Sequence, residues 1–344
     1  MIQRLFIANR GEIARRIIRT AQRLGMTTIL GVSSADHHSL PAREADEVVE
    51  IGPAPSAQSY LSIEAVVMAA KQARADAIHP GYGFLSENSA FARAVAAAGI
   101  TFVGADPAGL DAMGDKLRAR HVAMEAGLPV VPGGEAADAD EARARALETG
   151  YPLLIKAVSG GGGRGMKRVD RPEELDHQIA LAMAEALAAF GDARVYVERF
   201  IARGRHVEVQ VLGDGTHAIH LGTRDCSIQR RFQKLVEEAP APGLPPKREA
   251  ALTEAAVRLA RHIGYRGAGT AEFLVDAGTF DFFFLEMNAR IQVEHPVTEA
   301  ITGLDLVREQ IRIAEGHPLT LRQEDVEFRG HAIECRINAE DPRT

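Results

Sequence analysis

The chain has 344 residues, a length that suits two or three packed domains. Hydrophobic residues make up 46% and charged residues 25%, an ordinary globular balance, and no apolar run approaches the roughly eighteen residues of a membrane span. A formal net charge of −7 argues against a general nucleic-acid surface, and two cysteines, Cys226 and Cys335, are too few for a disulfide framework. We therefore expect a cytoplasmic protein that binds neither nucleic acid nor membrane.

Up to about residue 112, short β-rich runs alternate with helical stretches. The expected strands are "RLFIAN", "TTILGVSS", "DAIHP" and "ITFVG", and helices such as "GEIARRIIRTAQRLG" lie between them. This alternation predicts an α/β domain with a mainly parallel sheet over residues 1–112. The first turn, "ANRGEIA", lacks the G-x-G-x-x-G fingerprint, so a dinucleotide-dependent oxidoreductase is the least favoured function.

Residues 106–127 are expected to be helical and to end in a Pro/Gly-marked linker, "AGLPVVPGG". A smaller unit follows over about residues 130–202, with strands, two helices and the four-glycine run of "SGGGGRGM". The remainder is expected to be mixed and mostly antiparallel, with a helix near residues 247–263. The final segment, "RGHAIECRINAEDPRT", alternates like a strand and then stops. We therefore expect a fragment with an incomplete C-terminal sheet.

A polar stripe in "LEMNARIQVEH" is the first candidate for chemistry. If this segment is extended, one face carries the side chains of Glu286, Asn288, Arg290, Gln292 and Glu294. An ordinary half-exposed strand would explain such alternation. The preceding "FDFFFL" is apolar on both faces, however, and polar groups that emerge from a buried strand are costly to desolvate without a ligand.

Glu272 strengthens the functional interpretation. A hairpin with its turn near Gly278 and Thr279 would place Glu272 opposite Glu286. Two carboxylates facing each other across a ladder repel unless a cation lies between them. Their oxygens, with the carbonyl of Asn288, suit Mg²⁺.

The glycine run could be a slack surface loop or a phosphate-binding segment. It lacks the order of a P-loop, and a strand follows it, so it would act as a flap whose amides close over phosphates. Lys156 ends the apolar strand before it, and Lys116 opens a helix. Either lysine alone would usually be a solvated surface charge, but with the glycines both become candidates for phosphate contacts.

The segment "TRDCSIQRRFQKLVEEAPAPG" is rich in basic residues. Its four cations lie near Glu237 and Glu238 in the sequence, and they are Arg224, Arg230, Arg231 and Lys234. An exposed, salt-bridged loop is the simplest explanation. A cationic wall beside a phosphoryl-transfer centre fits better with the other motifs, because that chemistry depends on positioning and charge neutralisation.

Several of these segments together resemble biotin carboxylase, the ATP-grasp component of biotin-dependent acyl-CoA, pyruvate and urea carboxylases. They include "IHPGYGFLSEN", "IKAVSGGGGRGM", "RDCSIQRRFQK", "YRGAGTAEF", "EMNARIQVEHPVTE" and "GHAIECRINAEDP". The resemblance implies an α+β ATP-grasp domain over residues 113–344, with a small mobile lid over about 130–202 and a truncated C-terminal part. It also implies the reaction: MgATP phosphorylates bicarbonate to carboxyphosphate, which carboxylates N1 of biotin.

The resemblance extends to individual residues. Contacts with ATP are implied for Lys116, Lys156, Gly162, Gly163, Glu198, Arg199, Phe200, Ile201, His206, Glu272 and Glu286. The implied metal ligands are Glu272, Glu286 and Asn288, and the implied bicarbonate pocket is Lys234, Arg290, Gln292 and Val293. Glu294 would be the base that deprotonates bicarbonate, and Arg336 would bind biotin and stabilise its enolate. The implied catalytic set is Lys234, Arg290, Glu294 and Arg336.

Cofactors and partners follow from the same resemblance. They are ATP and Mg²⁺, with Mn²⁺ as the alternative ion, and biotin as a carried substrate. The chain has no Met-Lys-Met attachment sequence, so biotin would come from a carrier protein or domain. A carboxyltransferase component is the other expected partner, together with a homodimer where the C-terminal part is present.

The chain departs from the family pattern at a few positions. Phe232 replaces a polar residue, Thr223 replaces a glutamate and Arg199 replaces a lysine, and the hairpin after Glu272 is about two residues longer than usual. Two alternatives therefore stay open. One is another ATP-grasp ligase that joins a carboxylate to an amine, and the other is a catalytically weak nucleotide-binding fragment.

Overall fold

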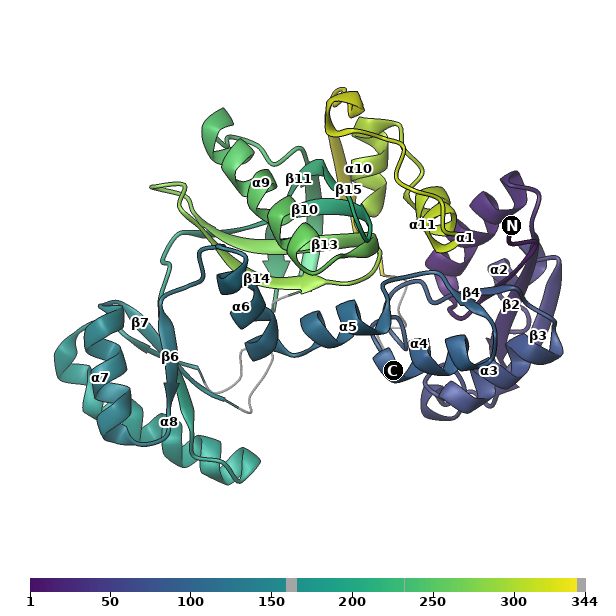
Figure 1. Ribbon diagram of the computed structural model, residues 1–344. Coiled ribbons are helices and arrows are strands. Elements are labelled where there is room, and N and C mark those ends of the chain that lie inside the picture. Colours follow the sequence, from purple (N-terminus) through teal and green to yellow (C-terminus); the bar gives the residue numbers. More distant parts are fainter. Residues whose placement is uncertain (159–165, 232, 339–344) are drawn as a thin grey trace.

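The computed structural model describes residues 1–158, 166–231 and 233–338, apart from the side chain of Lys116 (Figure 1). The N-terminal domain holds a five-stranded sheet in the order β3-β2-β1-β4-β5, and every neighbouring pair is parallel. Its strands are β1 (Arg4–Ile7), β2 (Thr27–Ser33), β3 (Glu47–Gly52), β4 (Ala77–His79) and β5 (Thr101–Phe102). The predicted parallel α/β domain is confirmed.

Helices cover this sheet, which is why nearly every residue of its central strands β1, β2 and β4 is buried. They are α1 (Gly11–Arg23), α2 (Leu40–Glu44), α3 (Ile63–Gln72) and α4 (Ser89–Ala97), with a short 3₁₀ turn at Ser56–Gln58. Helix α1 buries Ile13, Ile17 and Ile18 on one stripe, at the spacing of an amphipathic helix. The same stripe packs against α11 (Leu306–Ala314), so the N-terminal domain and the C-terminal helices share one hydrophobic core.

Two helices connect the N-terminal domain to the rest of the chain. The predicted helical segment divides into α5 (Pro107–Gly114) and α6 (Lys116–Glu125). Asp115 has an extended backbone, and its carboxylate accepts a hydrogen bond from the amide of Arg118 at 2.8 Å. It therefore acts as the N-cap of α6 and separates the two helices.

The segment predicted to be the lid forms a separate small unit at the left of Figure 1. It consists of β6 (Gly133–Ala136), α7 (Ala139–Thr149), β7 (Leu153–Ala157), β8 (Lys167–Val169), α8 (Leu175–Phe190) and β9 (Val195–Arg199), with a 3₁₀ turn at Pro172–Glu174. The strands form an antiparallel sheet in the order β6-β9-β7-β8, which packs its own apolar core against the two helices. Strand β6 was not predicted, because its glycine-rich sequence has the composition of a linker.

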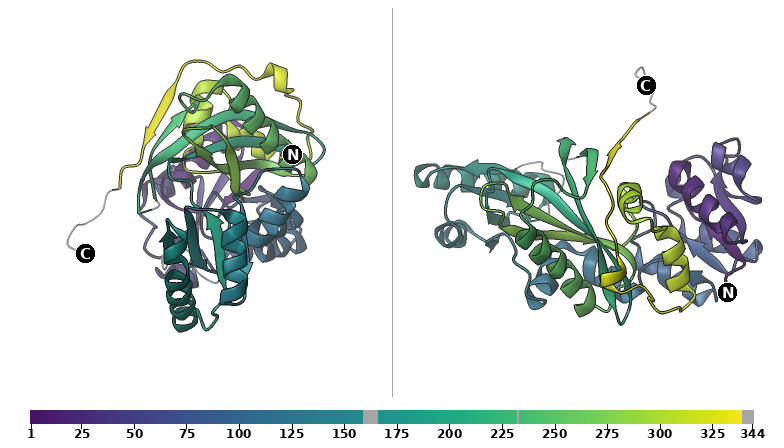
Figure 2. Two further views of the ribbon diagram at one scale, coloured as in Figure 1. Left: turned by 90° about the vertical axis from the view of Figure 1, so that its left-hand side faces the viewer. Right: turned by 90° about the horizontal axis from the view of Figure 1, so that it is seen from above.

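The third unit is a six-stranded antiparallel sheet in the order β14-β13-β10-β11-β12-β15, with β15 at one edge (Figure 2). Its strands are β10 (Gly204–Asp214), β11 (Ala218–Arg230), β12 (Gln233–Ala239), β13 (Arg266–Asp276), β14 (Phe282–Asn288) and β15 (Ala332–Cys335). Helices α9 (Pro246–His262) and α10 (His295–Thr302) complete it, and a 3₁₀ turn covers Gln323–Asp325. Antiparallel pairing throughout confirms the predicted fold class.

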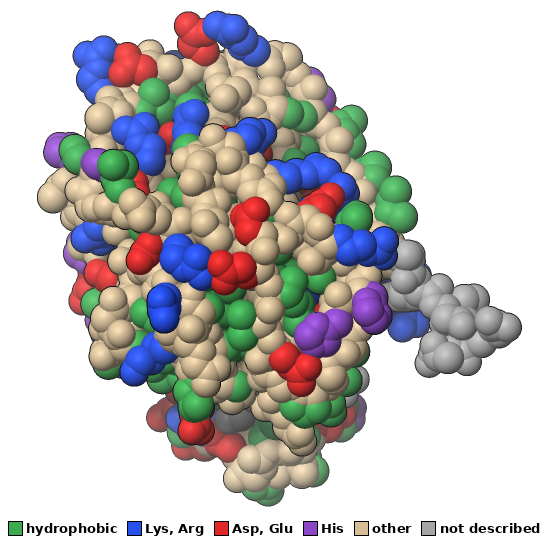
Figure 3. Space-filling model, turned by 90° about the vertical axis from the view of Figure 1, so that its right-hand side faces the viewer, with side chains coloured by type: hydrophobic (Ala, Val, Ile, Leu, Met, Phe, Trp, Pro, Cys, Tyr) green, Lys and Arg blue, Asp and Glu red, His purple; other side chains and the backbone are tan. Residues whose placement is uncertain are grey.

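Two further observations concern the hydropathy of the helices and the distribution of surface charge. None of the helices in the described parts of the chain is long and apolar enough to cross a membrane. On the face that Figure 3 shows, basic and acidic side chains are interspersed.

Candidate active site

Four neighbouring strands of the large sheet place a charged residue at the same register position. Glu208 on β10 lies opposite Arg224 on β11 and opposite Glu272 on β13, and Glu272 in turn lies opposite Glu286 on β14. The predicted pairing of Glu272 with Glu286 is therefore confirmed, although the ladder shifts register directly after Glu272. The period-two geometry of strands puts such partners on one face of the sheet, where their charges must be balanced.

Lys234, on β12, supplies one of the balancing charges. Its ammonium contacts three carboxylates, at 2.6 Å from Glu208, 2.7 Å from Glu294 and 3.0 Å from Glu272. Burial alone would lower the pKa of Lys234, but these three glutamates raise it well above its ordinary value. Lys234 is therefore a permanent cation at the centre of the site.

Arg224 supplies the other charge, from inside the protein. Its side chain is completely buried, and its Nε donates to Glu208 at 2.5 Å. The remaining donors reach the side-chain oxygens of Gln210, Thr298, Thr270 and Gln292. All five N–H groups of the guanidinium are thus used. The expectation of a cationic wall was wrong for Arg224, because this side chain points into the sheet core; Arg230 and Arg231 are exposed.

Glu272 is the most strongly hydrogen-bonded carboxylate of the site. One oxygen accepts from the amides of Asn288 and Gln292, both at 2.8 Å, and the other forms an ion pair with His206 Nε2 at 2.7 Å. Burial alone would raise the pKa of Glu272, but His206 and Lys234 lower it to about 2. Its carboxylate is therefore ionised at neutral pH, as a metal ligand must be.

The oxygen donors fit a divalent cation in two ways. Glu272 and Glu286 face each other across two strands, as Mg²⁺ ligands would. In the described structure, the side-chain oxygen of Asn288 instead accepts from Arg290 at 2.7 Å. The ligand atoms of His206, Glu208 and Glu272 also lie within 4.8 Å of one another. Glu208 is thus an additional potential ligand that sequence reasoning missed.

The chain after β14 differs from the prediction. Residues 289–294 are not part of a strand, because Ala289 and Ile291 turn into the core and His295 begins α10. Gln292 and Glu294 are nevertheless buried at the site, so the turn places them where an extended strand was expected to. Val293 lies beside them and is half-buried.

Two arginines border Glu294 and the turn before it. Arg290 binds Glu87 of the N-terminal domain at 2.8 Å, so that domain reaches the site. Arg336 follows β15 and donates from Nη2 to Glu294 at 3.0 Å and from Nε to Glu237 at 2.6 Å. Glu294 therefore lies between the cations of Lys234 and Arg336.

The lid contributes its own cation. Lys156 on β7 lies 2.8 Å from Glu198 on β9, and its ammonium lies over the ring of Tyr196 at 5.1 Å from the centroid. Glu198 and Arg199 end β9, and the next residues lead to β10. Phe200 stacks under Arg168, and Ile201 is half-buried. This is the segment for which the family resemblance implies contact with adenine.

Some predicted residues cannot be placed in this arrangement. Gly162, Gly163 and Phe232 lie outside the described residues. Lys116 is the first residue of α6, and its side chain also lies outside the description.

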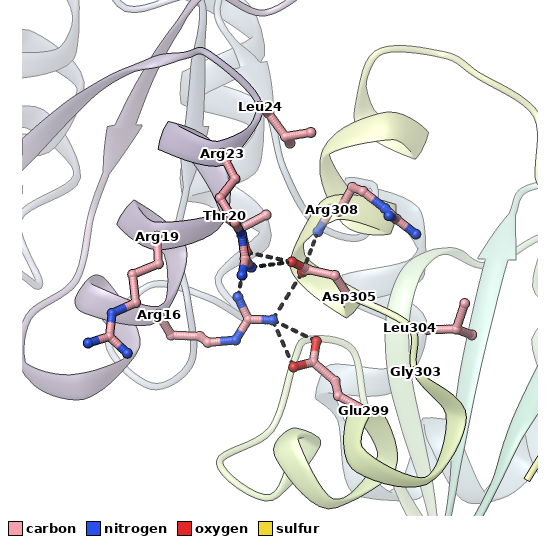
Figure 4. Close-up of a pocket in the computed structure, with 10 residues that line it drawn as sticks. All are labelled: Arg16, Arg19, Thr20, Arg23, Leu24, Glu299, Gly303, Leu304, Asp305 and Arg308. Atoms are coloured by element: carbon pink, nitrogen blue, oxygen red, sulfur yellow. Dashed lines mark hydrogen bonds and ion pairs between the residues drawn. The ribbon is translucent and has the colours of Figure 1, made fainter. Parts of the chain in front are cut away.

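A surface cavity of about 640 Å³ lies elsewhere, between α1 and the α10–α11 turn (Figure 4). Arg16 bridges it, with its guanidinium 2.6 Å from Glu299 and 3.0 Å from Asp305. Arg23 also binds Asp305. The positive charges of Arg16 and Arg23 are balanced by the carboxylates of Glu299 and Asp305. We therefore interpret the ion pairs that line this cavity mainly as contacts that join the two domains.

Sequence reasoning missed three residues of the site, and a signal existed for one. Glu208 lies in "HVEVQV", where alternation puts it on the face of His206 and Gln210. Glu87 and Glu237 gave no such signal, because their partners Arg290 and Arg336 are remote in sequence.

Comparison with known proteins identifies the family of the chain. The family model "Biotin carboxylase, N-terminal domain" matches residues 1–110, and "Carbamoyl-phosphate synthase L chain, ATP binding domain" matches residues 115–322. A biotin carboxylase of Pseudomonas aeruginosa is 53% identical over an alignment that covers 100% of this chain and 77% of that relative. The chain belongs to the biotin carboxylase family.

Solved structures of biotin carboxylases have the same fold. A Campylobacter jejuni biotin carboxylase in a β,γ-ATP complex has a TM-score of 0.90 and 48% identity, with 100% of this chain and 77% of that one covered. A biotin carboxylase domain dimer of Hydrogenobacter thermophilus 2-oxoglutarate carboxylase, bound to MgADP, ADP and bicarbonate, has a TM-score of 0.88 and 48% identity, with coverages of 100% and 76%. The predicted family, the fold class and the enzyme class, an ATP-dependent ligase, are confirmed.

Proposed function

We propose that this biotin carboxylase family member uses MgATP to phosphorylate bicarbonate and transfers the carboxyl group to N1 of biotin. The observation that carries the proposal is the position of Glu294, a buried carboxylate held between the ammonium of Lys234 and the guanidinium of Arg336. A general base beside two fixed cations suits a reaction in which an anion must be bound, deprotonated and activated.

Bicarbonate would bind against Lys234, Arg290, Gln292 and Val293. Glu294 would accept its proton, and the resulting oxygen would attack the γ-phosphorus of ATP as the bond to ADP breaks. Lys234 and Arg290 would balance the negative charge that collects around the transferred phosphoryl group. A bound Mg²⁺ would neutralise phosphate oxygens, with Glu272, Glu286 and Asn288 as its proposed ligands.

The remaining proposed contacts are divided between the lid and the large sheet. Lys156, Lys116 and His206 would contact ATP, Gly162 and Gly163 would cover its phosphates, and residues 198–201 would hold adenine. Arg336 would donate to the ureido oxygen of biotin and stabilise the enolate that develops as N1 reacts. We propose a boundary near residue 112 between the N-terminal and ATP-grasp domains, and a lid over about 130–202.

The proposed partners follow from the reaction. Biotin would arrive on a carrier protein or domain, and a carboxyltransferase would receive the carboxyl group. The Hydrogenobacter thermophilus relative is a domain dimer, which supports a homodimer as the assembly to look for.

The proposal is tested by ADP release from MgATP, measured with and without bicarbonate and free biotin. We expect each addition to stimulate release, and Glu294→Gln to abolish the stimulation. Glu238→Gln is the matched control, because Glu238 is only half-buried and pairs with His331 away from the site. Release that ignores bicarbonate in the unmodified chain would contradict the proposal and favour a different ATP-grasp ligase or a silent nucleotide-binding protein.

A further inference from the structure

Arg336 is held by two buried carboxylates at once. Its Nε donates to Glu237 at 2.6 Å and its Nη2 to Glu294 at 3.0 Å. Among the described residues, Nη1 makes no hydrogen bond. Because a guanidinium is planar and rigid, two fixed N–H groups also fix the direction of the third nitrogen.

The surroundings of Glu237 indicate that its side chain does not contribute to the stability of the fold. It lies on β12 and is completely buried, and directly opposite it on β15 lies Glu334. One side-chain oxygen of each glutamate is buried without a hydrogen-bond partner in the described structure. Two facing carboxyl groups, each with a buried oxygen that has no partner, cost stability, and an apolar pair would suit the same two positions better.

The stability lost by burying Glu237 is explained if its carboxylate competes with that of Glu294 for the guanidinium of Arg336. Arginine and a carboxylate prefer a two-pronged pair in which two parallel N–H groups meet both oxygens. In such a pair with Glu294, Arg336 would occupy both oxygens of the proposed base. By engaging Nε, Glu237 leaves Arg336 only one contact with Glu294, through Nη2.

We propose that Glu237 is a positioning residue that holds Arg336 by its Nε edge, so that Nη1 stays directed at the carbonyl of a cyclic urea and Arg336 contacts only one of the two oxygens of Glu294. This inference rests on the proposed function. Glu237 itself touches neither substrate, since it acts through Arg336.

The test compares Glu237→Gln, Glu237→Asp and the control Glu238→Gln, all in the full chain. Glu238 is the neighbour in sequence, but its side chain pairs with His331. For Glu237→Gln we expect the KM for free biotin to rise at least tenfold while the KM for MgATP changes less than twofold. Glu237→Asp keeps the charge and should recover part of the biotin affinity, and Glu238→Gln should match the unmodified chain.

A second readout does not depend on activity. In ¹⁵N-arginine-labelled protein, the Nε–H signal of Arg336 should be shifted downfield and protected from hydrogen exchange, and Glu237→Gln should remove the shift and the protection. Equal rises in both KM values, or an Nε–H signal that Glu237→Gln leaves unchanged, would overturn the inference. An unmodified chain that ignores biotin but retains the protected signal would count against the proposed function and leave the positioning of Arg336 standing.

Discussion

Arg224 Nε lies 2.5 Å from Glu208 Oε1, and both side chains are completely buried. The other oxygen of Glu208 binds Lys234, which binds Glu294, which binds Arg336, which binds Glu237. The site is thus one chain of alternating charges that begins in the sheet core and ends where β12 meets the edge strand β15. Each cation fixes the carboxylate on either side, so the reactive groups are preorganised before a substrate binds.

The inner end of this chain should be essential for folding. Arg224→Met leaves the Glu208 carboxylate buried with one cation fewer and removes hydrogen bonds to four other side chains. We expect the free energy of unfolding to fall by about 3–5 kcal/mol, measured by urea denaturation. Arg230→Met, at the exposed end of the same strand, should change it by less than about 0.5 kcal/mol. Equal effects of the two substitutions would contradict the assigned role of Arg224.

The lid cation should serve nucleotide binding. Lys156→Met removes the ammonium that lies beside Glu198, the first residue of the proposed adenine hinge. We expect the Kd for MgATP to rise at least tenfold in isothermal titration calorimetry, about 1.4 kcal/mol of binding free energy. Lys167→Met is the control, because Lys167 pairs with Glu185 elsewhere on the lid. If both variants bind MgATP equally well, Lys156 does not contact the nucleotide.

Arg16 should fasten the two domains together. Its half-buried guanidinium on α1 reaches Glu299 on α10 and Asp305 before α11, whereas the more exposed Arg23 reaches one carboxylate, that of Asp305. Arg16→Gln should lower the free energy of unfolding by about 1–3 kcal/mol. Arg23→Gln should lower it by less than about 1 kcal/mol, as is usual for exposed pairs. Chemical denaturation of the two variants checks the difference, and a larger loss in Arg23→Gln would refute the assignment.

Glu334 should make stability depend on pH near neutrality. Burial, together with the charges of Glu237 and Glu294, raises the pKa of Glu334 from 4.5 to about 7. The folded protein therefore holds a proton that the unfolded chain releases between pH 4.5 and 7, so this group lowers stability as pH rises through that range.

Glu334→Gln removes this titration. We expect the melting temperature of the variant relative to the unmodified chain to increase from pH 5 to pH 8. A difference that stays constant across this range would show that Glu334 is not protonated in the folded state.

Local patterns were enough to predict several parts of the fold and the site. Strand–helix alternation predicted the parallel sheet, and the hairpin turn predicted that Glu272 faces Glu286. The prediction that the strand continues beyond Asn288 was wrong. The alternation of polar and apolar residues there also suits a turn that buries Ile291. Tertiary packing, which a local pattern does not contain, decided between the two.

Pairings between remote segments were beyond local reasoning. The burial of Arg224 depends on acceptors from β10, β13 and α10, and its sequence neighbours Arg230 and Arg231 are exposed. Similarly, the contact of Glu237 with Arg336 exists only because β15 joins the edge of the sheet beside β12.

The central claim is that bicarbonate is activated by phosphorylation. The transfer of an oxygen atom from bicarbonate to the phosphate produced tests this claim most directly. The chain would be incubated with MgATP, biotin and ¹⁸O-labelled bicarbonate, and the phosphate produced would be examined by mass spectrometry. If bicarbonate attacks the γ-phosphorus, one labelled oxygen should appear in each phosphate. Phosphate without label would mean that water attacks ATP, and would contradict the proposed carboxyphosphate intermediate.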